Sequence, residues 1–125
     1  MPRASRETAS ESVDGAGFEG HYEHFEGGYT VGFETFTETV DMTPRLKGLP
    51  DDLCQSPHWG YVVSGKLTYR FGDRDEVIGE GEAFYVPPGH SVMSEAGTEI
   101  VFFSPTVEWK QTVAKIGRDR EAAPA

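Results

Sequence analysis

Short alternating segments separated by glycine and proline turns constrain the fold of this 125-residue chain more than any other feature. In KLTYRF (66–71), Leu67, Tyr69 and Phe71 share one parity and the polar residues share the other. This is the pattern of an antiparallel strand with one buried face. The turn sequences GDRD, GEG and PPG come next along the chain. Closely spaced strands with such turns predict an all-β sandwich or barrel.

The other expected elements follow from the same signals. Strands are expected within 21–40 and at 60–63, 76–78, 83–86, 91–95 and 98–103, with a loop over 41–52. One short C-terminal helix is expected, with Ser104 as its cap and Pro105 in its first turn. Trp109, Val113 and Ile116 would give this helix an apolar stripe that could lie on the barrel or on a partner subunit.

Charge and cysteine content restrict the partners and the compartment. The formal net charge is −10, which disfavours nucleic acid and anionic membranes as partners. No apolar stretch approaches the roughly 18 residues that would span a bilayer, and the N-terminus lacks the apolar segment of a signal peptide. A single cysteine agrees with a reducing compartment, so we expect a cytoplasmic protein.

The stretch CQSPHWGYVVSG places the lone Cys54 four residues before His58. The two side chains are either part of a metal site or a small buried hydrophobe beside a turn residue. Asp52 has the same parity but fits better in a solvated turn with Asp51. His21 and His24 are three residues apart, so on a strand they face opposite sides, and their role stays open.

Two linked motifs resemble the cupin superfamily of small jelly-roll barrels. PHWGYVVSGKLTYRF looks like the first cupin motif and GEGEAFYVPPGH like the second, with EAGTEIVFFSP after them. Together they resemble small single-domain bacterial cupins (type 2-like), most of which have no defined function. The resemblance implies a cupin jelly-roll (double-stranded β-helix) barrel and a homodimer. We expect a cupin domain over 18–117, a disordered tail over 1–17 and a flexible tail over 118–125.

Typical cupins bind a divalent metal through two histidines and a glutamate in the first motif and a third histidine after the second. Registered on Gly65, this sequence has the following residues at those four positions: Asp52, Cys54, His58 and Val92. None of the four family ligands is therefore present as such. His90 lies two residues before Val92 and could reach the barrel mouth with the same parity.

The resemblance and the residue types together suggest a metal site built from Cys54, His58 and His90. A thiolate with two imidazoles favours zinc, with iron or nickel as further candidates. Three protein ligands leave a position open for water or substrate. Tyr61 or Tyr85 could supply a hydroxyl nearby.

Three functions remain open at this level. The first is a small cupin that binds a divalent transition metal and a small organic molecule, with the reaction and enzymatic activity undecided. The second is a metal-free ligand-binding or regulatory module without catalysis. The third is a structural dimer without a working site. In the homodimer, the segment 21–40 is a candidate for strand addition between subunits.

Overall fold

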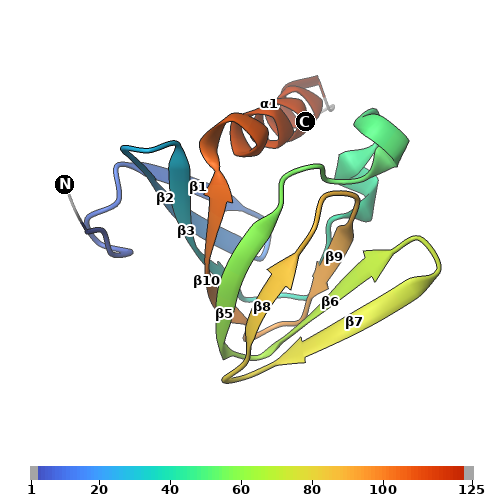
Figure 1. Ribbon diagram of the computed structural model, residues 1–125, viewed down its shortest axis with the longest axis horizontal. Helices are drawn as coiled ribbons and strands as arrows, with labels where there is room; N and C mark the ends of the chain where they lie inside the picture. Colours follow the sequence, from blue (N-terminus) through green and yellow to red (C-terminus); the bar gives the residue numbers. More distant parts are fainter. Residues whose placement is uncertain (1–2, 123–125) are drawn as a thin grey trace.

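The computed structural model describes residues 3–122, which form two antiparallel sheets facing each other and one helix (Figure 1). The strands of the six-stranded sheet are β1 (Glu11–Gly15), β2 (Phe18–Phe25), β3 (Tyr29–Phe36), β5 (His58–Ser64), β8 (Ala83–Val86) and β10 (Glu99–Pro105). Those of the four-stranded sheet are β4 (Val40–Asp41), β6 (Lys66–Phe71), β7 (Arg74–Gly79) and β9 (Ser91–Ser94). Two 3-10 turns, η1 (Thr43–Leu46) and η2 (Pro50–Asp52), precede β5, and α1 (Thr106–Ala122) ends the described chain.

The strand order is that of a jelly roll. The first sheet runs β1-β2-β3-β10-β5-β8 and the second runs β4-β9-β6-β7. From β5 to β10 the chain crosses between the sheets at most of its turns, so neighbours along the chain often lie in opposite walls. The predicted all-β, jelly-roll barrel with a short C-terminal helix is confirmed.

Every strand expected in the central region is present, two of them with the expected bounds. β5 and β7 are longer than expected, and β7 begins at Arg74, inside the expected GDRD turn. β6 covers 66–71 and β8 covers 83–86, as the alternation and the flanking turns indicate. Leu67 and Tyr69 of β6 are buried, as expected for a strand with one inward face. Gly65 adopts a φ of 84° between β5 and β6, a conformation that glycine adopts without steric cost.

The N-terminal segment differs from the disordered tail expected over 1–17. Residues 11–15 form β1, which pairs with β2 from Glu11↔Tyr22 to Gly15↔Phe18. Val13 packs against the core, and Arg6 Nη2 donates a 2.8 Å hydrogen bond to Glu99 Oε1. Ladder hydrogen bonds and one apolar anchor therefore order a segment whose composition is mostly polar.

The C-terminal helix begins and ends later than expected. β10 continues through Pro105 and α1 starts at Thr106, so Ser104 is a strand residue and not a helix cap. The helix extends through 118–122, where a flexible tail was expected. The side chain of Ile116 and residues 123–125 lie outside what the structure describes. No helix among the described residues is long and apolar enough to cross a membrane.

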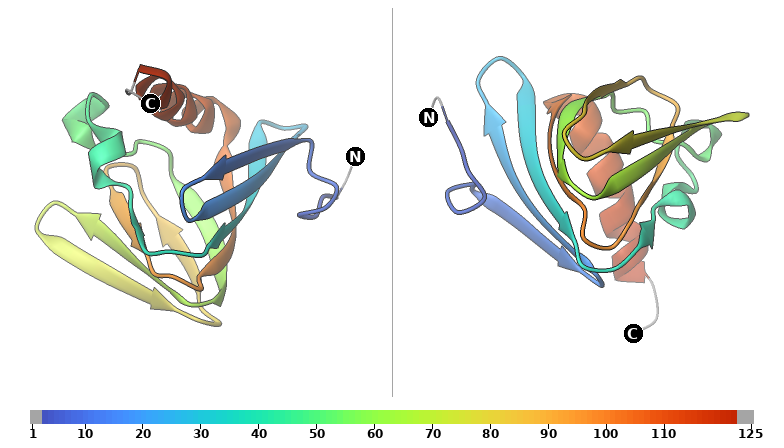
Figure 2. Two further views of the ribbon diagram at one scale, coloured as in Figure 1. Left: turned by 180° about the vertical axis from the view of Figure 1, so that it is seen from behind. Right: turned by 90° about the horizontal axis from the view of Figure 1, so that it is seen from below.

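The core fills the space between the two sheets. Its buried cluster consists of Tyr22, Phe36, Val62, Leu67, Tyr69, Val86, Ile100 and Phe102. At one end of the barrel, α1 and η1 lie against each other, which Figures 1 and 2 show beside the strand ends. This end holds the candidate site.

Candidate metal centre and cavity

Backbone pairing brings Cys54 and His90 together although they are far apart in the sequence. Cys54 N donates to His90 O at 2.8 Å, and His90 N donates to Cys54 O at 3.2 Å, which forms an isolated antiparallel bridge. His58 opens β5 and pairs with Val86, the last residue of β8. The PPG turn then leads from Val86 to His90. Two strand ends and one bridge thus place the three side chains at one end of the barrel.

Sγ of Cys54 and one ring nitrogen of each histidine all lie within 4.8 Å of one another. Cys54 Sγ is 4.0 Å from His58 Nε2, and the two imidazole rings are 5.0 Å apart between centroids. The three residues are buried, His90 almost completely. We call Cys54, His58 and His90 the triad; the structure brings together the three residues that the sequence singled out.

Hydrogen bonds fix the rotation of both imidazole rings. His90 Nδ1 donates to Pro87 O at 2.8 Å; because a carbonyl can only accept, Nε2 of His90 keeps its lone pair. His58 Nδ1 contacts the Ser104 hydroxyl, and this leaves His58 Nε2 on the side of the thiol. Metal-binding histidines are oriented in this way, through the ring nitrogen that does not bind the metal.

Burial keeps all three side chains neutral. It lowers the pKa of His58 to about 3, with a smaller contribution from the nearby His90. It also lowers the pKa of His90, although the hydrogen bond to Pro87 opposes the shift. The pKa of the Cys54 thiol is raised, chiefly by burial. The triad therefore consists of two neutral imidazoles and one thiol that must lose its proton before it can act as a thiolate.

The triad opens into a cavity of about 220 Å³ between the sheets. Apolar side chains from both sheets line most of it, among them Phe36, Leu67, Ile100 and Phe102. An apolar cavity of about 150 Å³ suffices to bind benzene in an engineered protein. The space here accommodates a molecule somewhat larger than one aromatic ring.

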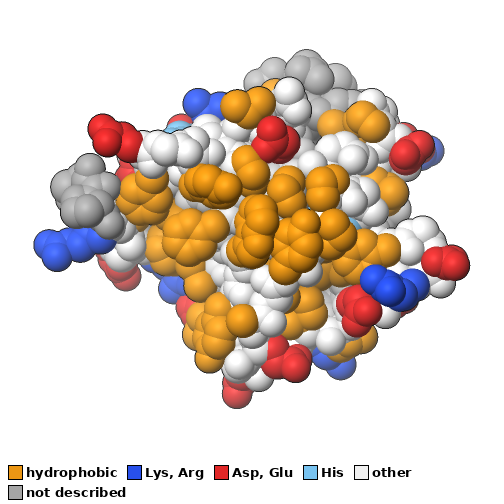
Figure 3. Space-filling model, viewed as in Figure 1, with side chains coloured by type: hydrophobic (Ala, Val, Ile, Leu, Met, Phe, Trp, Pro, Cys, Tyr) orange, Lys and Arg blue, Asp and Glu red, His pale blue; other side chains and the backbone are white. Residues whose placement is uncertain are grey.

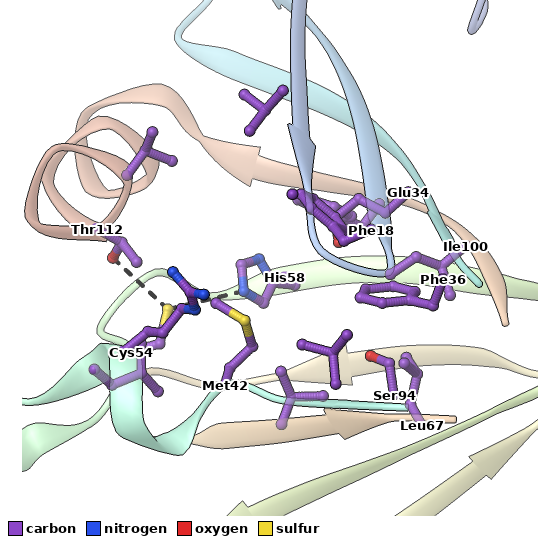
Figure 4. Close-up of a pocket in the computed structure, with 18 of the residues that line it drawn as sticks. Phe18, Glu34, Phe36, Met42, Cys54, His58, Leu67, Ser94, Ile100 and Thr112 are labelled. Carbon is purple, nitrogen blue, oxygen red and sulfur yellow. Dashed lines mark hydrogen bonds between the residues drawn. The ribbon is translucent and has the colours of Figure 1, made fainter. Parts of the chain in front are cut away.

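Figure 4 shows the arrangement along this cavity. Cys54 and Thr112 lie on one side, with Thr112 Oγ1 3.7 Å from the sulfur, and His58 lies beyond them. Glu34, Phe18, Phe36 and Ile100 lie on the other side. The cavity therefore has the triad at one end and the carboxyl group of Glu34 among apolar side chains at the other.

Several sequence-based candidates lie elsewhere. Tyr61 and Tyr85 are 44% and 54% exposed on the outer sheet face, so they cannot supply a hydroxyl to the triad. Asp52 is an exposed residue of η2 and accepts a hydrogen bond from Gly48 N. His21 bonds to Glu19 and Ser12, and His24 to Glu11 and Thr30; neither histidine lines the cavity.

Sequence reasoning missed Thr112, Ser104, Tyr22 and Glu34. Ser104 was interpreted as a helix cap, and Thr112 lies on the helix face that carries Trp109 and Val113 toward the cavity. The signal for Glu34 was its place in a strand between Phe33 and Phe36, where an acidic residue of inward parity is unusual. Val92, at the family's third-histidine position, lines the cavity as an apolar residue.

Comparison with known proteins supports the cupin interpretation. The sequence model of the family described as Cupin domain matches residues 55–101, a range that includes His58 and His90 but not Cys54. No curated protein matches this chain in sequence.

Solved structures share the fold at low sequence identity. An RmlC-like cupin from Shewanella frigidimarina superposes with a TM-score of 0.57 at 20% identity, covering 84% of this chain and 91% of that one. Streptomyces Pac13, described as a unique nucleoside dehydratase, gives 0.57 at 16% identity, with coverage of 85% and 82%. The polyketide cyclase RemF from Streptomyces resistomycificus gives 0.57 at 15%, covering 85% and 80%. At these identities the likeness establishes the fold alone.

Proposed function

Since the chain is a small domain of the cupin superfamily, we propose that it binds a divalent transition metal through the triad and a small organic molecule in the adjoining cavity. One observation carries the proposal: a thiol and two imidazoles, buried and with their rings held by hydrogen bonds, converge within 4.8 Å.

The donor set fits zinc in kind, and its spacing would have to contract on binding. Zinc–sulfur and zinc–nitrogen bonds of about 2.3 and 2.0–2.1 Å separate tetrahedral ligands by roughly 3.5 Å. The sulfur and His58 Nε2 are 4.0 Å apart, and the three donor atoms lie within 4.8 Å of one another, so the side chains would have to move closer together. Sulfur with nitrogen favours zinc, and iron or nickel also accept these ligands. Such a metal, held by the triad, would supply Lewis-acid chemistry beside the cavity.

The cavity supports a small, mainly apolar ligand. It joins the triad to a lining of aromatic and aliphatic side chains, which is the composition of small-molecule sites. Among the structural neighbours, Pac13 has been solved with uridine, so this architecture accommodates small organic molecules in at least one protein. A ligand with an oxygen or nitrogen atom at one end could reach the metal while its apolar body fills the barrel.

Elemental analysis of purified protein tests the metal. We expect one metal ion per chain in wild-type protein from metal-replete medium, and loss of that metal in Cys54→Ser and in His58→Ala. His21→Ala is the matched control, because this histidine lies outside the cavity on β2. Circular dichroism confirms that each variant is folded. Folded wild-type protein without metal would contradict the proposal and favour the alternative of a metal-free ligand-binding or regulatory module.

A thermal-shift screen of small acids and phenols tests the ligand. Molecules that occupy the cavity raise the melting temperature in proportion to their affinity and concentration. We expect shifts with ring-sized molecules and none with molecules too large for about 220 Å³. Absence of any shift, together with absence of metal, would leave the third function, a structural dimer without a working site.

We also propose that the protein forms a homodimer through the outer face of the six-stranded sheet. Five aromatic side chains, which we call the outer aromatic face, are 43–54% exposed there: Tyr29, Trp59, Tyr61, Tyr85 and Phe103. Figure 3 shows hydrophobic side chains gathered across this side of the molecule. Strand addition by the segment 21–40 has less support, because both edges of β2 and β3 are already paired.

A further inference from the structure

Glu34 is an acidic residue of β3 that lines the cavity. It lines the cavity opposite Cys54, beyond His58 and among Phe18, Phe36 and Ile100 (Figure 4). Part of its surface remains accessible, and no lysine or arginine of the described residues forms an ion pair with it. Glu34 therefore does not serve to neutralise a basic side chain in an ion pair.

Tyr22 on the neighbouring strand holds this carboxyl group. Its hydroxyl donates a hydrogen bond of 2.6 Å to Glu34 Oε2. Two glycines make the contact possible, because a Cβ at Gly20 would lie 2.2 Å from the Tyr22 hydroxyl oxygen and one at Gly32 would lie 3.0 Å from its ring. In the register of β2 and β3, Gly20 pairs with Glu34 and Tyr22 pairs with Gly32. The register of β2 and β3 thus brings Tyr22 and Glu34 together.

The second carboxyl oxygen is left without a partner. Glu34 Oε1 makes no hydrogen bond with any residue in the described range, whereas Oε2 is held by Tyr22. Burial raises the pKa of Glu34 to about 7, although the hydrogen bond from Tyr22 opposes the shift. Near neutral pH the carboxyl group therefore exists in both forms, with one oxygen free to meet a ligand.

We propose that Glu34 is the acid–base group of the cavity, positioned by Tyr22, and that it exchanges a proton with a small, mainly apolar molecule bearing a carbonyl, carboxylate or hydroxyl oxygen. When it acts as an acid, its O–H bond breaks as an O–H bond forms on the ligand, and the carboxylate keeps the electron pair. This role rests on the proposed function in one respect: an organic molecule must enter the cavity. It does not require the metal.

Other titratable groups share the cavity and bear on this proton. Besides Tyr22, they are Tyr69 on β6, the triad, Glu11 on β1 and Arg45 in η1. Burial is the main cause of the raised pKa of Tyr69 and of Cys54, and the charge of Glu34 adds to both shifts, so these two groups lie within its electrostatic range. Both stay protonated near neutral pH, and Glu34 is the group of the cavity that changes charge there.

Labelling with diisopropylcarbodiimide, a small apolar reagent, tests the proposal on the intact protein. The carboxyl oxygen bonds to the central carbon of the reagent, the carboxyl proton moves to nitrogen, and rearrangement leaves a stable N-acylurea that peptide mass spectrometry locates. The reaction requires a protonated carboxyl group, so an ionised carboxylate reacts little. We expect Glu34 to be labelled at pH 6 and labelling to fall about tenfold by pH 8.

Two variants test whether Tyr22 positions the carboxyl group of Glu34 or only packs beside it. Glu34→Gln removes the labelled site and identifies the carboxyl 13C resonance of Glu34 by its disappearance. Tyr22→Phe keeps the ring in place but removes the donor that favours the charged form, so labelling persists to higher pH and the 13C titration midpoint rises above the wild-type value near 7. A midpoint that does not move in Tyr22→Phe would overturn the positioning role.

An unlabelled Glu34 at pH 6 in folded wild-type protein overturns the proposal, because a carboxyl group that is inaccessible to a small apolar molecule, or that carries no proton at this pH, cannot act as the acid of the cavity. Labelling that does not change between pH 6 and pH 8 overturns it as well. Metal content is measured on the same samples. A reactive Glu34 in protein that binds no metal contradicts the proposed metal site and leaves the acid–base role standing.

Discussion

At the scale of single residues, burial favours the neutral forms of the three side chains that we propose as metal ligands. Burial lowers the pKa of His58 and of His90, which favours neutral imidazoles, whereas it raises the pKa of the Cys54 thiol, which favours the protonated form. Metal binding must therefore release one proton, and it comes from the sulfur.

This predicts how metal affinity depends on pH. Between pH 6 and pH 8 the association constant for zinc should rise about tenfold per pH unit, because one proton is displaced for each metal bound. Cys54→Ser should bind far more weakly and with little pH dependence, since its remaining ligands are already deprotonated. Competition with a chromophoric chelator at several pH values measures both slopes. A flat wild-type profile would show that the thiol is not a ligand.

The pKa of Glu34 predicts a second pH effect, on stability. The pKa is raised from 4.5 in the unfolded chain to about 7 in the folded one, so its stabilising contribution is complete below pH 4.5 and is lost as pH rises through 7. The loss is at most on the order of 3 kcal/mol, because part of the side chain remains accessible. Urea unfolding of wild type and Glu34→Gln at pH 4.5, 6 and 8 measures the difference.

The control for this prediction is the shape of the Glu34→Gln curve. Histidine and surface groups titrate equally in both proteins, so their effects cancel in the comparison. Relative to wild type, the variant should gain stability between pH 4.5 and pH 8. Parallel curves for the two proteins would mean that Glu34 has an ordinary pKa in the folded state.

The sequence could single out the three residues of the triad but not the residues that contact them or line the site around them. Cys54 and His58 are four residues apart in one motif, and His90 follows the next turn, so local spacing and family register singled them out. Ser104, Thr112 and Tyr22 reach the site from β10, α1 and β2. Their roles depend on long-range packing, which no local pattern encodes.

At the scale of elements, the turn between β5 and β6 depends on a glycine. Gly65 has a φ of 84°, and a Cβ there would lie 2.4 Å from Thr98 Oγ1 and 2.5 Å from Thr98 Cα. Thr98 is fully buried, and its hydroxyl bonds to both the N–H and the carbonyl of Lys66. A side chain at 65 would therefore displace a residue that closes the barrel.

Gly65→Ala should destabilise the protein by about 2–4 kcal/mol, the sum of a left-handed backbone and a disturbed buried hydrogen-bond pair. The matched control is Gly72→Ala in the turn between β6 and β7, which has a φ of 59° but nothing within 4 Å of the added Cβ. It should cost about 1 kcal/mol. Chemical denaturation compares the two, and equal losses would contradict the role of Thr98.

Alternation predicted strand positions well and their inward faces only in part. β6 has one apolar face, and that face is buried. In β3 and β5 the apolar parity containing Tyr29, Trp59 and Tyr61 points outward, whereas Gly32, Glu34 and His58 point inward. This sheet therefore has exposed aromatic side chains on its outer face and a few polar side chains among the apolar ones of its inner face, which departs from a strict alternation of apolar and polar residues.

At the scale of the whole molecule, the outer aromatic face is the surface that we propose as the dimer interface. Trp59 and Tyr85 pack with ring centroids 5.0 Å apart, and Trp59 also meets Tyr29 at 6.4 Å. Such a contiguous exposed patch marks an interaction site, and a stable interface buries about 800 Å² on each partner. A two-fold dimer would place the same aromatic rings on both sides of the interface.

Trp59→Glu should therefore convert the protein from a dimer to a monomer. Two like charges would face each other near the centre of a desolvated interface, which opposes association strongly. Val77→Glu is the control, since Val77 is 59% exposed on β7 of the other sheet and should leave assembly unchanged. Light scattering after size exclusion reports twice 13.8 kDa for a dimer and 13.8 kDa for a monomer. A wild-type monomer, or a dimer that survives Trp59→Glu, would place the interface elsewhere.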